Sequence, residues 1–317
     1  MSERARLVVI LGPTASGKSA LGIELAARLG GEILVCDSTQ VYRHFDIGTA
    51  KVPPSERRGI PHHLVDLVEP QEIFTAGDYR RRALDVLEDL RRRGKLPILT
   101  AGTGLYLRAL LEGLADAPTR SEELRERLRQ NADQRGPAHL HHVLARLDAE
   151  AAGRIAPRDT QKVIRALEIR LLSGRTVGEV HRGGREGLEG YEIKKIGLLP
   201  PRPALYARIN ARAKAMMAAG WLEEVKGLIE RGVPEDAKPF QFIGYAELRQ
   251  HLEGCHDRDA AVAAIQQATR RFAKRQITWF RKEPGVEWLV GFGDDPEVAA
   301  AALRIARDGV GRHSGTF

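Results

Sequence analysis

The chain has 317 residues, 43% of them hydrophobic, which is enough for one large domain with an insertion or for two domains. Two cysteines, Cys36 and Cys255, are too few for a disulfide framework or a cysteine-based metal site, so we expect a cytoplasmic protein. No apolar run has the length of a membrane span, and the first predicted strand begins almost at the N-terminus, so we expect neither a membrane anchor nor a signal peptide. The net charge of +8 favours a polyanionic partner such as nucleic acid, although many soluble proteins are equally basic.

The strongest motif is residues 12–19, G-P-T-A-S-G-K-S, which match the phosphate-binding P-loop pattern. The apolar run 7–11 before the motif predicts a buried strand, and leucines at helical spacing in 20–29 predict a helix after it. A strand, a glycine loop and a helix are the context that a P-loop requires. We therefore expect a polyphosphate to bind Gly12, Pro13, Thr14, Ala15, Ser16, Gly17, Lys18 and Ser19. Lys18 would supply positive charge, and the Ser19 hydroxyl is the predicted ligand of Mg²⁺.

Two further predicted strands end at polar residues. Asp37 directly follows the apolar run 33–36, and a glycine-rich turn containing Thr103 follows the run 97–100. Ligands of open α/β sheets bind beside the carboxyl ends of the strands, so we expect Asp37 and Thr103 to lie near the P-loop and to act in catalysis with Lys18. A turn or a helix cap is the ordinary use of such an aspartate, and the residues alone leave it open.

The succession of strands and helices predicts an α/β fold, a P-loop NTPase-like parallel sheet flanked by helices. Residues 1–119 form the first part of this core. Residues 120–190 are charged, with apolar residues at helical spacing, and predict an all-helical insertion. Residues 191–317 return to the core with a strand at 193–199, a helix at 205–219 and further helices.

Two groups of basic residues are candidates for anion binding. Arg208 and Arg212 lie one turn apart on the predicted helix 205–219. Further along the chain, a basic ridge is predicted on one helix face, with Phe272 and Ile277 on the opposite face; its members are Arg270, Arg271, Lys274 and Arg275. Such a ridge suits contacts with RNA phosphates, and it is equally consistent with a solvated helix face.

Several segments along nearly the whole chain resemble motifs of the tRNA dimethylallyltransferase (tRNA isopentenyltransferase) family. After the P-loop they are D-S-T-Q-V-Y at 37–42, D-I-G-T-A-K at 46–51, G-T-G-L-Y at 102–106 and T-R-R-F-A-K-R-Q-I-T-W-F-R at 269–281. The resemblance implies transfer of the dimethylallyl group of dimethylallyl diphosphate to the exocyclic N6 amine of the adenosine 3′-adjacent to the anticodon in tRNA. It also implies Mg²⁺ as cofactor, the anticodon stem-loop of tRNA as partner and a monomeric enzyme.

The resemblance assigns roles to individual residues. Asp37 would accept the proton of the amine, Thr103 would contact the flipped base, and Arg212 would reach the diphosphate. The implied tRNA contacts are Asp37, Ser38, Thr39, Gln40, Thr103, Arg125, Gln161, Lys162, Val163, Ile164, Arg165, Arg271 and Lys274. The chain departs from the family pattern at Ala101, Lys162, Gln241 and Ala246.

Other functions remain open at this point. A small-molecule P-loop kinase would use the same loop, with Asp37 serving a hydroxyl acceptor. An isopentenyltransferase acting on free adenine nucleotides would need no RNA contacts, and the insertion and the basic ridge favour tRNA over it. A GTPase-like RNA-binding module is disfavoured because the sequence has no N-K-x-D guanine motif.

Overall fold

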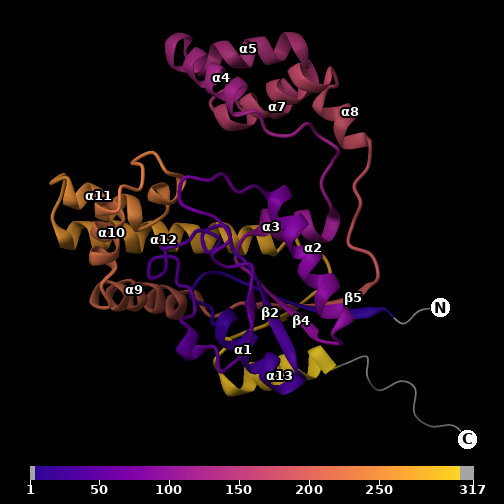
Figure 1. Cartoon of the computed structure of the whole chain (residues 1–317), viewed down its shortest axis with the longest axis vertical. Coiled ribbons are helices and arrows are strands. Elements are labelled where there is room, and N and C mark those ends of the chain that lie inside the picture. The colour runs from indigo at the N-terminus through magenta and orange to yellow at the C-terminus, as the bar shows by residue number, and fades with distance from the viewer. Residues whose placement is uncertain (1–3, 308–317) are drawn as a thin grey trace, which may run out of the picture. The chain divides into compact units, whose positions relative to one another are not determined.

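The computed structural model describes residues 4–307 (Figure 1). Six strands form one sheet in the order β3-β2-β4-β1-β5-β6, and every neighbouring pair is parallel. The strands are β1 Ala5–Leu11, β2 Gly31–Cys36, β3 His62–His63, β4 Leu96–Ala101, β5 Tyr191–Leu198 and β6 Val286–Leu289. The predicted α/β fold with a parallel sheet is confirmed.

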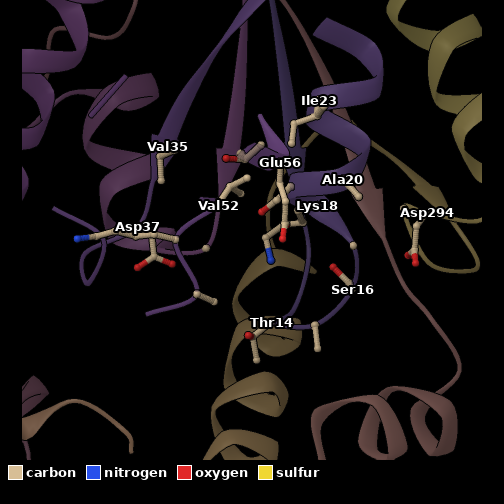
Figure 2. Close-up of a pocket in the computed structure, with 18 of the residues that line it drawn as sticks. Thr14, Ser16, Lys18, Ala20, Ile23, Val35, Asp37, Val52, Glu56 and Asp294 are labelled. Carbon is tan, nitrogen blue, oxygen red and sulfur yellow. The ribbon is translucent and has the colours of Figure 1, made fainter. Parts of the chain in front are cut away.

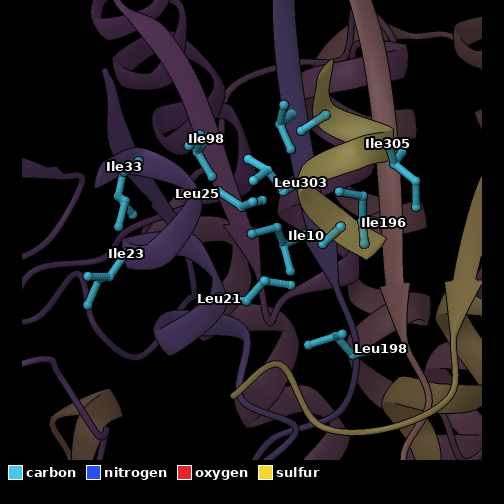
Figure 3. Packing of buried hydrophobic residues seen from close by; sticks show 14 of the residues in the cluster. Ile10, Leu21, Ile23, Leu25, Ile33, Ile98, Ile196, Leu198, Leu303 and Ile305 are labelled. Atoms are coloured by element: carbon cyan, nitrogen blue, oxygen red, sulfur yellow. The ribbon is translucent and has the colours of Figure 1, made fainter. Parts of the chain in front are cut away.

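Helices cover the sheet because its central strands are apolar on both faces. The helices of this core are α1 Lys18–Leu29, α2 Ala76–Arg92, α3 Gly104–Glu112, α9 Arg202–Ala218, α10 Trp221–Glu230, α11 Tyr245–Leu252, α12 Arg258–Phe280 and α13 Pro296–Arg307. Figure 3 shows side chains of α1 and α13 packed against those of the strands, among them Leu21, Leu303, Ile10 and Ile196. Thr75 caps α2 through a reciprocal pair of hydrogen bonds with Asp78. No helix within residues 4–307 has the length and apolar character needed to span a membrane.

The register of the sheet brings three functional loops together. β4 lies between β1 and β2, and Ala101 of β4 is level with Leu11 on one side and with Cys36 on the other. The P-loop, Asp37 and the turn at Gly102 therefore leave the same edge of the sheet from three neighbouring strands. This register is the reason why residues far apart in the sequence can form one site.

The loop that follows Asp37 is held against α10 and α11. Glu224 accepts hydrogen bonds from the N–H groups of Asp46 and Ile47 and from the Tyr245 hydroxyl. The Trp221 ring lies so close to Gly48 and Gly244 that a Cβ atom at either glycine would come within 2.2 or 1.9 Å of it. The contact with Trp221 explains why position 48, the glycine of the D-I-G-T-A-K segment, has no room for a side chain.

Residues Leu111–Leu188 form a separate compact unit. Its helices are α4 Glu122–Arg135, α5 Pro137–Leu147, α6 Ala149–Arg154, α7 Thr160–Ser173 and α8 Val177–Arg182. They pack around a core that includes Leu140, Leu144, Val163 and Leu167. The unit starts at residue 111 instead of the predicted 120, because the segment after α3 pairs with the segment before β5, as the bridge between Ala115 and Arg185 shows.

A buried ion pair joins the helices of this unit. The carboxylate of Glu168 on α7 is fully buried; it accepts hydrogen bonds from the Arg125 guanidinium at 2.7 and 2.8 Å, from Arg165, and from the Ser121 N–H at 2.8 Å. Burial alone would raise the pKa of this carboxyl, but the hydrogen bonds, those of Arg125 above all, lower it to about 2.

We expect Glu168→Gln to destabilise the protein by about 3 kcal/mol at neutral pH, because two arginines lose their shared anion. The folded pKa lies below the ordinary value of 4.5, so this stability is present above pH 4.5 and is lost as the pH falls toward 2. Urea unfolding of both proteins between pH 3 and 7 measures the difference. Glu150→Gln, which breaks an exposed pair with Arg154, is the control and should cost under about 1 kcal/mol. An equal cost for the two variants would contradict the structural role of Glu168.

Candidate active site

The P-loop connects β1 to α1, as predicted, and a turn after β6 supports it. Gly17 has a φ of +88°, and a Cβ atom there would lie 2.7 Å from the Gly293 nitrogen and from the Asp294 carboxylate. Glycine is therefore required at this position on both conformational and steric grounds. The Gly293 N–H also donates to the Ser16 carbonyl at 2.8 Å. The C-terminal part of the core thus holds the loop in shape.

Two of the cations that line the cavity, Lys18 and Arg212, interact with each other's charge beside the P-loop. The Lys18 ammonium donates to the carbonyls of Gly12 and Pro13 at 2.9 and 2.8 Å. Its pKa is about 8, because burial lowers it strongly while the charge of Asp37 raises it in part and that of Arg212 lowers it further. Arg212 on α9 lines the same cavity, and burial and the neighbouring Arg208 lower its pKa. No carboxylate within residues 4–307 forms an ion pair with either cation, so the cavity attracts an anion.

Arg208 has a different role from Arg212, one turn away. Its guanidinium binds the Asp294 carboxylate with two hydrogen bonds of 2.7 Å and lies 4.6 Å above the centre of the Phe292 ring. The pair with Asp294 neutralises the charge of Arg208 and fixes the turn that supports Gly17. Arg212 is therefore the arginine of the two that lines the cavity without an ion-pair partner among residues 4–307, and its contact with a diphosphate stays a prediction.

Asp37 faces the cavity from the end of β2 (Figure 2). Its Oδ1 atom accepts hydrogen bonds from the N–H and the hydroxyl of Thr39, at 2.9 and 2.7 Å, so the turn interpretation of this aspartate is also correct. The Oδ2 atom lies against Gly102, where a Cβ atom would come within 2.5 Å of it. The turn thus fixes one carboxylate oxygen and aims the whole group toward the end of β4.

Thr103 supports the Asp37 turn. Its hydroxyl accepts a hydrogen bond from the Ser38 N–H at 2.9 Å and donates to the Ser38 hydroxyl at 3.2 Å. Gln40, at the end of the same turn, donates to the Thr49 carbonyl at 2.9 Å. The hydroxyl that sequence reasoning assigned to a substrate contact is therefore engaged with the loop that carries Asp37.

Gln276 is a site residue that sequence reasoning did not identify. Its side chain extends from α12, is 5% exposed, and forms one hydrogen bond with the P-loop and one with Gly102. A signal was present in the sequence. Ala273 and Phe280 place this face of α12 in the core, and a glutamine on a buried helix face needs polar partners.

The cavity has a volume of about 1230 Å³ and extends from the P-loop along α1 to a side that carries both aliphatic and charged residues, among them Glu56 and Arg57. Figure 2 shows Ile23, Val35 and Val52 on that side, while Lys18 and Asp37 lie toward the loops. Ser19, the predicted metal ligand, also lines the cavity and is exposed there. Within residues 4–307, no three His, Cys, Asp or Glu side chains converge to hold a metal ion.

The predicted tRNA-binding residues of the insertion divide into three sets. Gln161 and Lys162 are exposed on α7. The side chains of Val163 and Ile164 are buried, so the prediction that they contact RNA is corrected: their helical spacing turns them into the core of the insertion. Arg125 and Arg165 are both bound to Glu168: Arg125 joins α4 to α7, and Arg165, on α7 itself, also donates to the Pro118 carbonyl at 3.2 Å.

The basic ridge on α12 is present with one change. Arg271, Lys274 and Arg275 are exposed, and Arg271 and Lys274 have no ion-pair partner in the described part of the chain. Arg270 leaves the ridge because its guanidinium donates to Asn210 of α9 at 2.6 Å. The same helix thus presents cations on its outer face and Gln276 on its inner face.

Comparison with known proteins agrees with these observations. The model of the IPP transferase family matches residues 40–283. A tRNA dimethylallyltransferase from Koribacter versatilis is 51% identical over 95% of this chain and 98% of its own, and one from Solibacter usitatus is 49% identical with the same coverage. Among solved structures, the full-length tRNA isopentenylpyrophosphate transferase from Bacillus halodurans has a TM-score of 0.69 at 37% identity, covering 96% of this chain and 98% of its own. A eukaryotic dimethylallyltransferase acting on tRNA has a TM-score of 0.79 at 28% identity, covering 90% and 74%. The resemblance found in the sequence motifs is confirmed, and the chain belongs to the IPP transferase family.

Proposed function

We propose that the protein transfers the dimethylallyl group of dimethylallyl diphosphate to the N6 amine of the adenosine 3′-adjacent to the anticodon in tRNA. The observation that carries the proposal is one cavity in which two cations without carboxylate partners, Lys18 and Arg212, face the carboxylate of Asp37. The cations suit a diphosphate, and the carboxylate suits the proton of an amine. Family membership and the names of the relatives support tRNA as the acceptor.

In the proposed reaction the diphosphate is the leaving group. The allylic C–O bond breaks, its electron pair leaves with the diphosphate, and Lys18, Arg212 and the backbone N–H groups at the start of α1 stabilise the developing charge. The lone pair of the N6 amine forms the new C–N bond. The amine proton passes to the carboxylate of Asp37, whose orientation is held by Thr39 and Gly102.

A Mg²⁺ ion fits this site as it fits other P-loops. The donors would be the Ser19 hydroxyl, which is exposed in the cavity beside Lys18, and the oxygens of the diphosphate itself. Bound there, the ion would help to neutralise the leaving group. The absence of a carboxylate cluster among the described residues suits a metal that arrives with its phosphate ligand.

The RNA-binding part of the proposal rests on exposed cations. Arg271 and Lys274 on α12 and Lys162 on α7 suit contacts with phosphates, which position an RNA without reading its bases. A base in a single-stranded loop can be turned out of its stack and into a pocket, whereas a paired base cannot be reached. On the family resemblance, we also propose a monomeric, cytoplasmic enzyme.

The reaction is tested by incubating the protein with Mg²⁺, dimethylallyl diphosphate and unmodified tRNA, then digesting the RNA and determining nucleoside masses. A prenylated adenosine that depends on the diphosphate is expected. Product only with adenosine monophosphate as acceptor would replace tRNA by a free nucleotide, and no product with either acceptor would contradict the proposal.

Asp37→Asn should lower transfer about 10²- to 10⁴-fold, because the amide keeps an acceptor for Thr39 but cannot take up a proton. Binding of tRNA, measured by filter retention, should stay near wild type. Thr39→Val, which removes one hydrogen bond of the turn and leaves the carboxylate, is the control and should retain most activity. Transfer by Asp37→Asn at the wild-type rate would show that Asp37 is not the base.

Lys18→Met should weaken the binding of inorganic pyrophosphate about tenfold to a hundredfold, the equivalent of about 1.5–3 kcal/mol for a charged hydrogen-bond donor. The Lys18 pKa is about 8, so this ratio between wild type and variant should be largest below pH 8 and should shrink above it, as the wild-type ammonium loses its proton. Calorimetric titration between pH 7 and 9.5 gives the ratio. Lys214→Met, an exposed lysine of α9 outside the cavity, should bind like wild type at each pH. A ratio independent of pH would argue against a titrating Lys18.

Charge reversal at Arg271 and Lys274 should weaken tRNA binding at least tenfold at low salt, since two contacts with phosphates become repulsive. The slope of log affinity against log salt concentration should become shallower by about 1.5. Reversal of Arg91 and Arg92 on α2, which are exposed but paired with Glu88 and Asp89, is the matched control. If both pairs of substitutions have the same effect, the ridge is an ordinary solvated face.

A further inference from the structure

Gln276 connects the P-loop, which is the proposed diphosphate site, to the turn at Gly102, against which the proposed base Asp37 packs. Its Oε1 atom accepts a hydrogen bond from the Thr14 N–H of the P-loop at 2.7 Å, and its Nε2 atom donates to the Gly102 carbonyl at 2.7 Å. The partners settle which atom is oxygen and which is nitrogen, because a backbone N–H can only donate and a carbonyl can only accept. We propose that Gln276 is a positioning residue, which sets the placement of the diphosphate site relative to the base Asp37. The inference rests on the proposed function.

On the P-loop side, Gln276 acts on the peptide that also binds Lys18. The N–H of Thr14 and the carbonyl of Pro13 belong to one planar peptide group and point in opposite directions. Gln276 holds the N–H end, and the Lys18 ammonium donates to the carbonyl end at 2.8 Å. Rotation of this peptide would therefore move the atom that holds the ammonium beside the cavity.

On the other side, Gln276 acts on the residue against which Asp37 packs. The Gly102 N–H donates to the Cys36 carbonyl at 3.0 Å, directly before Asp37, and the Asp37 Oδ2 atom lies against Gly102. A shift of Gly102 would therefore move both the backbone beside Asp37 and the surface that its carboxylate touches. One amide thus controls the loop of the leaving group and the loop of the base.

Burial makes this link specific. The glutamine side chain is 5% exposed on the inner face of α12, where its neighbours along the helix, Ala273 and Phe280, are apolar. Filling the same space with methionine would keep the volume but leave the Thr14 N–H and the Gly102 carbonyl without their partner. A residue that only filled space would need no amide here, so the polar group points to positioning.

The first test compares Gln276→Met with Gln266→Met. Gln266 lies on the same helix and also donates to a backbone carbonyl, that of Asn210 at 3.1 Å, but it contacts neither loop. We expect Gln276→Met to lose about 10²-fold in kcat for prenyl transfer, because a displacement of about 1 Å between reacting groups costs about that much. Its affinity for inorganic pyrophosphate should fall less than tenfold, and Gln266→Met should change neither.

The second test is the conservative variant Gln276→Glu. A protonated glutamic acid has one donor and one acceptor, as the amide requires here, whereas a carboxylate would repel the Gly102 carbonyl. The charged groups lining the same cavity are Lys18, Arg212, the Arg208–Asp294 pair and Asp37, together with Glu24, Arg28, Asp46, Lys51, Glu56, Arg57 and Arg58, and the titratable His62. We expect the ratio of the variant's kcat to the wild-type kcat to rise at least tenfold between pH 8.5 and 6, while the ratio for Gln276→Met stays flat.

The outcomes separate this inference from the proposed function. Absence of prenylated product with the wild-type protein would contradict the function itself. With active wild type, three results would each overturn the positioning role: a kcat of Gln276→Met equal to that of Gln266→Met, equal losses of kcat and pyrophosphate affinity, or a flat ratio for Gln276→Glu. If Gln276→Met does not fold, as judged by circular dichroism, Gln276→Glu decides alone.

Discussion

The candidate site depends on two cations, Lys18 and Arg212, which line a partly enclosed cavity and form no ion pair with a carboxylate of residues 4–307. A protein normally pairs its buried cations, as this chain does for Arg125 with Glu168. At the anion site it does not, and Lys18 is left with backbone carbonyls alone. Burial disfavours the charged form of Lys18 and lowers its pKa to about 8, because the charge of Asp37 offsets the effect of burial only in part. A diphosphate would supply the missing negative charge.

Segments from the C-terminal part of the chain hold the P-loop in place. Gly293 and Asp294 brace one side of the P-loop, and Gln276 braces the other. Neither support belongs to the P-loop motif, which consists of residues 12–19 alone. A P-loop motif therefore predicts phosphate binding. The orientation of the loop, and the residues that face it across the cavity, are set by the elements packed around it.

Local features of the sequence predicted the fold and the centre of the site. The P-loop motif fixes its own conformation, and the rule that ligands bind at strand ends brings Asp37 to it without further information. Pairs across long stretches of chain could not be predicted, because nothing near Gln276 indicates Thr14 or Gly102 as partners, and nothing near Arg125 indicates Glu168. Helical periodicity indicates that Val163 and Ile164 are buried, whereas the family resemblance implies that they contact tRNA.

The order of the strands explains why one P-loop fold can serve alkyl transfer. Neighbouring strands are about 4.8 Å apart, and β4 lies between β1 and β2, so the P-loop and Asp37 leave the sheet about 10 Å from each other. That span accommodates a diphosphate at one end, a proton acceptor at the other and an allylic carbon with its attacking amine between them. In a kinase the transferred phosphorus would lie within the cradle of the loop. Here the atom under attack would lie beyond the cradle, where Ile23, Val35 and Val52 line the cavity among charged residues such as Glu56 and Arg57. The aliphatic side chains offer a hydrocarbon on the diphosphate a contact that a third phosphate could not use.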